Sequence, residues 1–176
     1  MANKAAQSAF FLGTGMQIIK KILGVILFAS MVGISVITLM QLFARHLSIE
    51  FPGGGELAQL AAVWLYFMGM AHATFNGTHI QGGIEELITN RVATRAMRAV
   101  AVVALLLFSV IGLYLSVDMF VTTLAKKYVS IYYGIPMVFS VAALVLGFFL
   151  NVVAVIWRAL TGAAFSDAAA ASHIEV

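Results

Sequence analysis

The stretch ILGVILFASMVGISVITLMQLF, residues 22–43, contains 22 residues and no charged side chain. A helix needs about 20 mostly apolar residues to cross the hydrocarbon core of a bilayer, so this stretch predicts a membrane-spanning helix. Similar runs over residues 57–75, 99–121 and 137–160 predict three further spans. We therefore expect an all-α integral membrane protein, with four transmembrane helices in a single membrane domain over residues 1–176.

The composition of the chain agrees with a membrane protein. Of its 176 residues, 62% are hydrophobic and 10% are charged, whereas soluble domains average about 45–50% apolar and about 25% charged residues. The absence of cysteine excludes disulfides, cysteine-based metal sites and thiol nucleophiles. The formal charge is +3, but the basic residues stand at the edges of the apolar runs. They indicate membrane topology rather than binding to nucleic acid.

The basic residues also predict how the spans are oriented. Seven of the ten Lys and Arg residues stand before the first span, between the second and third spans, or after the fourth. Because Lys and Arg are enriched in cytoplasmic connections, both termini are expected in the cytoplasm. The two loops on the opposite side of the membrane are residues 45–56 (RHLSIEFPGGGE) and 125–136 (AKKYVSIYYGIP).

Between the second and third spans the pattern changes, over about residues 84–98. Apolar residues recur there at helical spacing, while Arg91, Arg95 and Arg98 share a different face. This pattern predicts an amphipathic interfacial helix. The three arginines would anchor it at the headgroups, each adding about 1 kcal/mol of attraction to anionic lipids. The alanine-rich tail, about residues 166–176, is expected to be flexible.

Two histidines in and after the second span are candidate ligands. His72, Asn76 and His79 fall on one helical face. A spacing of seven residues separates two side chains by roughly 10 Å along a helix, which is too far for both to bind one metal ion. Hydrogen bonding at an interface is therefore the favoured interpretation. A small four-helix redox or metal protein using His72 and His79 remains the alternative.

Three further polar residues lie in or beside the spans. Glu56 stands in the first turn of the second span, where a carboxylate is favoured by exposed N–H groups, so capping and partner contact are favoured over ion coupling. Asp118 is expected to be solvated, or paired with Lys126, and Asn151 is expected to bond across helices. A stand-alone proton-coupled transporter with Glu56 or Asp118 as its proton site is a second alternative.

One segment resembles a known family. The resemblance is to the central signature of the small membrane subunit, the DctQ-like subunit, of tripartite ATP-independent periplasmic (TRAP) transporters. It rests on Glu56-Leu57, Trp64, Phe67, Gly69 and Gly77-Thr78-His79-Ile80. It implies a sodium-coupled importer of organic acids in the bacterial inner membrane. In that scheme a periplasmic binding protein delivers substrate to a large elevator-type membrane subunit.

The resemblance also implies what this chain does within the importer. It would be no enzyme, bind no substrate and hold no cofactor, with the sodium sites in the large subunit. It would brace the fixed part of that subunit and help to dock the binding protein. The residues expected at partner or scaffold contacts are Glu56, Trp64, Gly69, His72 and His79. Small residues beside them, Ala71 and Ala73, would let a partner helix or a sister helix approach closely.

Overall fold

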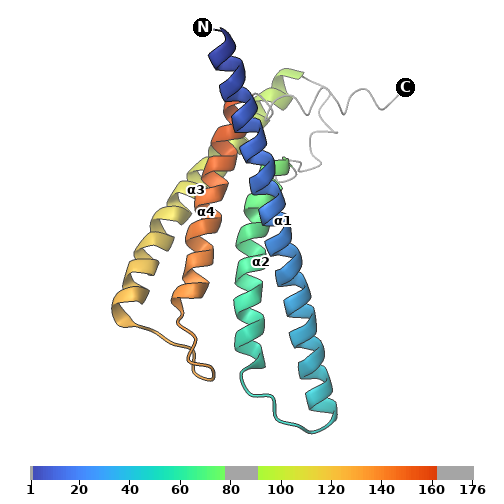
Figure 1. The fold of residues 1–176 in the computed structure, drawn as a ribbon. Coiled ribbons are helices and arrows are strands. Elements are labelled where there is room, and N and C mark those ends of the chain that lie inside the picture. The colour runs from blue at the N-terminus through green and yellow to red at the C-terminus, as the bar shows by residue number, and fades with distance from the viewer. Residues whose placement is uncertain (1, 78–90, 162–176) are drawn as a thin grey trace, which may run out of the picture.

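The computed structural model describes residues 2–77 and 91–161 of the chain. Successive helices run in opposite directions (Figure 1), so the loops over residues 47–53 and 127–137 lie together at one end of the bundle, here named the loop end. The opposite end is named the terminal end. The helices are α1 (Ala2–His46), α2 (Gly54–Asn76), α3 (Arg91–Lys126) and α4 (Val138–Leu160).

The all-helical fold is confirmed within the described residues, and three of the helices are long and apolar enough to cross a membrane. These candidate spans are Gly15–His46, Ala99–Lys126 and Val138–Leu160. α2 is not among them, because polar side chains such as Gln59, Tyr66 and His72 interrupt its apolar residues. That α2 forms a fourth span stays a prediction.

Several helix boundaries differ from the predicted spans. α1 begins at Ala2 rather than at residue 22, and α3 ends at Lys126 rather than at residue 121. The interfacial helix expected to end at residue 98 is continuous with the third apolar segment, because no proline or glycine occurs between Arg91 and Gly112. Its first part, residues 84–90, lies outside the described residues. α2 begins at Gly54 rather than at residue 57, so two of the three consecutive glycines belong to its first turn.

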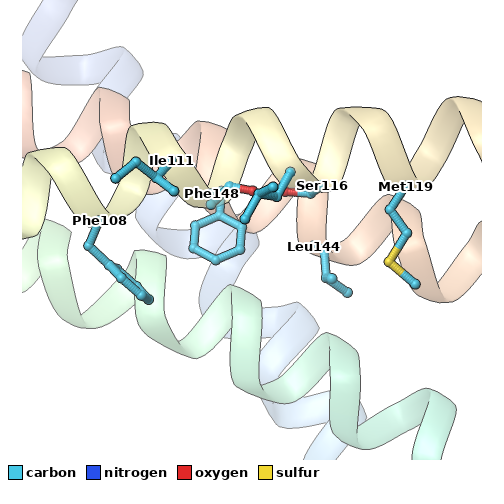
Figure 2. A pocket seen from close by; sticks show the side chains of 8 residues that line it. Phe108, Ile111, Ser116, Met119, Leu144 and Phe148 are labelled. Atoms are coloured by element: carbon cyan, nitrogen blue, oxygen red, sulfur yellow. The ribbon is translucent and has the colours of Figure 1, made fainter.

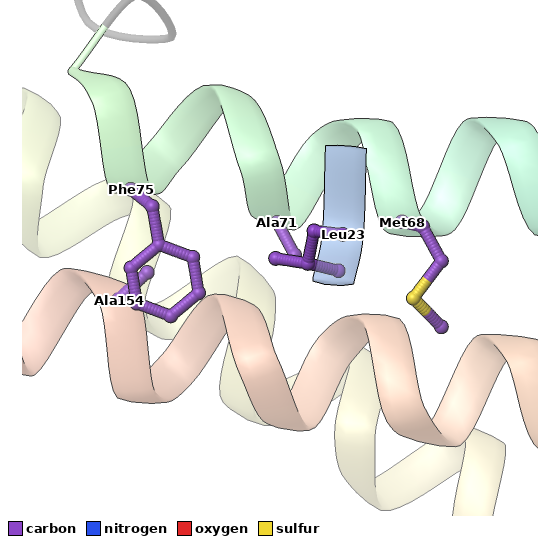
Figure 3. Close-up of a cluster of buried hydrophobic side chains, with 5 residues drawn as sticks. All are labelled: Leu23, Met68, Ala71, Phe75 and Ala154. Carbon is purple, nitrogen blue, oxygen red and sulfur yellow. The ribbon is translucent and has the colours of Figure 1, made fainter. Parts of the chain in front are cut away.

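The helices pack in the spatial order α1, α2, α4, α3 (Figure 1). A cluster of buried apolar side chains joins the first three of them, as Figure 3 shows; its members are Leu23, Met68, Ala71, Phe75 and Ala154. Alanines in this cluster let the helices approach closely. α2 thus lies between α1 and α4, although it is not among the candidate spans.

Two glycines allow α4 to contact its neighbours closely. A Cβ at Gly147 would meet the Cβ and backbone of Phe67 in α2, and a Cβ at Gly112 would meet the ring of Phe148. The ring of Phe148 lies 5.4 Å from that of Phe67 and 5.8 Å from that of Phe108, measured between centroids. Phe148 thus packs between α2 and α3 and fixes their distance from α4.

Candidate functional site

At the loop end, the carboxylate of Glu56 joins the two loops. Glu56 lies in the first turn of α2. This helix follows Gly53, whose backbone is in the left-handed conformation. The hydroxyl of Ser130 donates a hydrogen bond to the carboxylate. The backbone N–H groups of Ile131 and Tyr132 donate two more, at 3.1 and 3.3 Å. A residue of α2 is thereby tied to the loop that connects α3 with α4.

The second loop can bind a carboxylate because its backbone turns tightly. Val129 pairs with Pro136 as an isolated antiparallel bridge, and Gly134 adopts a positive φ of 61°. The turn directs consecutive backbone N–H groups to one side, an arrangement that suits anions. Tyr133 adds a hydrogen bond from its hydroxyl to the carbonyl oxygen of Pro52, at 3.3 Å. The two loops therefore form one surface, here named the loop junction.

The surroundings of Glu56 favour its charged form. The hydrogen bond from Ser130 is the largest cause of a lowered pKa of Glu56; partial removal from water opposes it, and the backbone N–H groups of Tyr132, Ile131 and Tyr133 add to it. The carboxylate is consequently ionised at neutral pH. It acts here as an anion that orders a loop of the same chain. A contact of Glu56 with a partner stays a prediction.

Apolar side chains surround the loop junction and point away from the bundle. Ile131 is 88% exposed, and Tyr132, Leu47 and Ile49 are also mostly exposed. Because Glu56 holds the backbone of Ile131 and Tyr132, this apolar surface is presented in a fixed conformation. An ordered patch of aromatic and aliphatic side chains is a common feature of protein interfaces.

In the centre of the bundle, Asn151 connects three helices. Thr74 of α2 donates a hydrogen bond to Oδ1 of Asn151 at 2.5 Å, and Nδ2 of Asn151 donates to Oγ of Ser109 in α3 at 2.5 Å. All three side chains are 0% exposed. The prediction that Asn151 bonds across helices is confirmed. Because no water reaches these groups, each bond is costly to break.

The other buried hydroxyl groups of α3 bond within their own helix. Ser116 donates to the carbonyl of Gly112, and Thr123 donates to the carbonyl of Met119 at 2.7 Å. A shallow hollow of about 270 Å³ lies beside them between α3 and α4 (Figure 2). Its lining is almost wholly apolar, with Phe108, Leu144 and Phe148 among the residues involved. Such a surface suits hydrocarbon rather than an ion or an organic acid.

At the terminal end, Arg158 of α4 packs on Gly77, the residue that follows α2. Gly77 caps the C-terminus of α2 with φ 80°, and its N–H contacts the carbonyl oxygens of Ala73 and Thr74. A Cβ at Gly77 would collide with the guanidinium of Arg158. Arg158 is 8% exposed. The sequence indicates only that this charge marks membrane topology, whereas the structure buries it beside the negative end of the α2 dipole.

The structure describes the surroundings of some of the remaining residues with predicted contacts, but not of all of them. Trp64 packs against the buried cluster, and a Cβ at Gly69 would lie 3.5 Å from Leu27 of α1, so both face a sister helix. Nε2 of His72 lies 2.9 Å from Nδ2 of Asn76. His79 lies outside the described residues, as do the side chains of the three arginines at the start of α3. Their predicted roles stay predictions.

Metal binding by the histidines receives no support from the part of the chain that the structure describes. Within residues 2–77 and 91–161, no three His, Asp or Glu side chains are grouped closely enough to hold a metal ion. His72 contributes one ring there, and Nδ1 of that ring is buried without a hydrogen-bond partner among these residues.

Sequence reasoning missed the loop junction. The turn YYGIP at residues 132–136 was recognisable from Gly134 and Pro136, and Glu56 was recognised as a helix-start residue. Nothing in the sequence, however, pairs Glu56 with Ser130, which is 74 residues away. The usable signal was weaker: an acidic residue and an N–H-rich turn, both expected at the same end of the bundle.

The family model for the DctQ component of the tripartite ATP-independent periplasmic transporters matches residues 34–165. This range covers more than half of the chain and includes α2, both loops of the junction, and the three residues of the Asn151 network. No curated protein and no solved structure matches.

Proposed function

Because the chain belongs to the DctQ component family of the TRAP transporters, we propose that it braces the fixed part of the large membrane subunit in a secondary importer of organic acids. The family assignment makes it a small membrane component of a transporter, and no catalytic role is implied. In the proposed arrangement the chain enlarges the rigid frame against which the mobile part of the large subunit moves.

The use of the buried polar side chains supports the bracing role. Within the described helices, the five buried Thr, Ser and Asn side chains all hydrogen-bond to the chain itself; they are Thr74, Ser109, Ser116, Thr123 and Asn151. A transporter that binds cargo needs polar groups directed into a cavity. Here Thr74, Ser109 and Asn151 bond across helices, and Ser116 and Thr123 bond within α3, so these groups are used for structure, as a rigid scaffold requires. This is the observation on which the proposal depends most.

The loop junction is the surface we propose for docking the periplasmic binding protein. With both termini in the cytoplasm, as the distribution of Lys and Arg favours, the junction faces the periplasm. Its exposed Ile131 and Tyr132, held in place by Glu56, offer apolar contact area to a soluble partner. Sodium and substrate sites are assigned to the large subunit, and none to this chain.

Co-expression with the large subunit and the binding protein tests the proposal. The tagged chain should purify with the large subunit in a fixed ratio, and proteoliposomes with all three parts should show sodium-driven uptake of an organic acid. Liposomes that contain this chain alone should show none. Recovery of the chain as a stable monomer without the large subunit, or uptake by the chain alone, would contradict the bracing role.

A further inference from the structure

One face of α3 carries ionisable and polar side chains that the chain itself does not cover. Asp118 is exposed, and Tyr114, one turn earlier, is 75% exposed. Both belong to the candidate span Ala99–Lys126. At 3.6 residues per turn, Asp118 lies about 200° around the helix from Ser116, which is buried on the side of α4. These two side chains therefore lie on the back of α3.

Asp118 lies too deep in the candidate span for water to solvate its carboxylate. Eight residues of helix place it about 12 Å from Lys126 along the axis, and the headgroup layer is only roughly 5–8 Å thick. With Lys126 at the water boundary, the carboxylate lies several Å inside the hydrocarbon. Its side chain is too short to reach back to the surface, unlike Lys or Arg. Tyr114 lies about 6 Å deeper still.

The pairing of Asp118 with Lys126, which the sequence suggested, is not formed. The ammonium of Lys126 lies 5.8 Å from the ring centroid of Tyr128, in the loop. Within the described residues, no hydrogen bond or ion pair to Asp118 or to the Tyr114 hydroxyl is present. Among the described helices, α4 is the main neighbour of α3, and it packs on the side of Ser116, opposite to Asp118. Intramembrane carboxylates usually pair with a cation or face a protein interior.

We propose that the back of α3 is the docking face for the large membrane subunit. The partner helix would carry a Lys or Arg side chain facing Asp118 and a hydrogen-bonding group facing Tyr114. Charge complementarity is the reason for choosing a basic helix over lipid tails, which offer no partner for a carboxylate. The exposed face of α1 is, by contrast, lined by apolar side chains such as Phe28, Val32 and Val36, and suits lipid.

This inference rests on the proposed function, because it names where the large subunit binds. The first test measures how much large subunit is recovered with the tagged chain. Asp118→Asn should lower recovery about tenfold or more, because it leaves the partner's basic side chain unpaired, and Asp118→Lys should lower it at least as much. Asp118→Glu keeps the carboxylate, so recovery should stay close to that of the wild type. Thr38→Lys is the matched control, since Thr38 is exposed on α1 and precedes His46 by eight residues.

A second measurement separates docking from folding. The thermal midpoint of the isolated chain in detergent should be unchanged or higher with Asp118→Asn, since this change removes a charge from an apolar surface. Tyr114→Phe should weaken the complex more than Tyr66→Phe does, since Tyr66 is similarly exposed (72%) but lies on α2. A midpoint that falls in parallel with recovery, or a larger effect at Tyr66, would overturn the assignment to α3.

Crosslinking locates the contact directly. The chain has no cysteine, so a single cysteine can carry a benzophenone probe at Leu107, on the back of α3, or at Met31 on α1. The large subunit should be captured from position 107 at least fivefold more than from position 31. If the wild-type complex forms but capture is equal, or position 107 captures a second copy of this chain, the docking face is wrong. If no wild-type complex forms, the proposed function fails instead.

Discussion

Two polar clusters join distant parts of this chain, and they differ in what surrounds them. In the centre, Asn151 bonds Thr74 and Ser109 out of contact with water. At the loop end, Glu56 bonds Ser130 and backbone N–H groups at the surface. Water can replace a broken bond only at the surface. The central cluster should therefore govern stability, whereas the loop junction should govern the order of one binding surface.

The largest effect should come from adding a methyl group where α4 contacts α2 closely, at Gly147. A Cβ at Gly147 would lie 2.5 Å from Cβ of Phe67 and 2.9 Å from its backbone oxygen, so Gly147→Ala must push α2 and α4 apart. The free energy of unfolding, measured by SDS titration in mixed micelles, should fall by about 3 kcal/mol. Gly55→Ala is the control, since no atom lies within 4 Å of its Cβ position, and it should be neutral or stabilising.

The next largest effect should come from isolating the Asn151 amide. Thr74→Val combined with Ser109→Ala removes both of its hydrogen-bond partners, and the free energy of unfolding should fall by about 2 kcal/mol in the same assay. Ser116→Ala should change it by less than about 0.5 kcal/mol, because that hydroxyl bonds only within its own helix. Wild-type stability in the double variant would mean that the amide finds another partner.

Removing the amide itself should cost less than isolating it. In Asn151→Leu, the Thr74 hydroxyl keeps the Met70 carbonyl at 3.0 Å, and the Ser109 hydroxyl keeps the Leu105 carbonyl at 2.6 Å. The expected loss in the free energy of unfolding is about 1 kcal/mol, from the missing cross-helix bonds. A loss greater than that of the double variant would refute this ranking.

At the loop junction, Glu56→Gln should leave global stability nearly unchanged and yet loosen one loop. The amide N–H groups of Ile131 and Tyr132 donate to the carboxylate, and a neutral amide accepts more weakly. Their hydrogen exchange, followed by mass spectrometry, should become several-fold faster. Glu50→Gln, an exposed acidic residue of the first loop, is the matched control and should leave this exchange unchanged.

The smallest effect should be the pH dependence of the same contact. Because the pKa of Glu56 is lowered from its ordinary value of 4.5, the charged form is bound more strongly in the folded chain. The contribution of Glu56 is thus complete above pH 4.5 and is lost as the pH falls through the lowered pKa. The amide proton shifts of Ile131 and Tyr132 should report this titration by NMR. A midpoint above 4.5 would contradict it.

The positions of the helices were predictable from the sequence, and the contacts between them were not. The uncharged run over residues 22–43 depends on nearby residues, and it lies within the apolar helix Gly15–His46. The boundary at residue 98 was wrong, because a change from an amphipathic to an apolar pattern does not break a helix. The burial of Arg158 was not predictable, because it depends on the end of another helix, at Gly77.

The sequence alone determined that this is an all-helical membrane chain without cysteine chemistry, and its residues 56–80 carried the family resemblance. Only the tertiary structure decided which polar groups meet: Asn151 with Thr74 and Ser109, and Glu56 with the turn after Ser130. The physical reason is the distance along the chain over which each property is determined. Burial in a bilayer follows from the composition of one segment, whereas a hydrogen bond across helices depends on their order, rotation and relative height in the bundle.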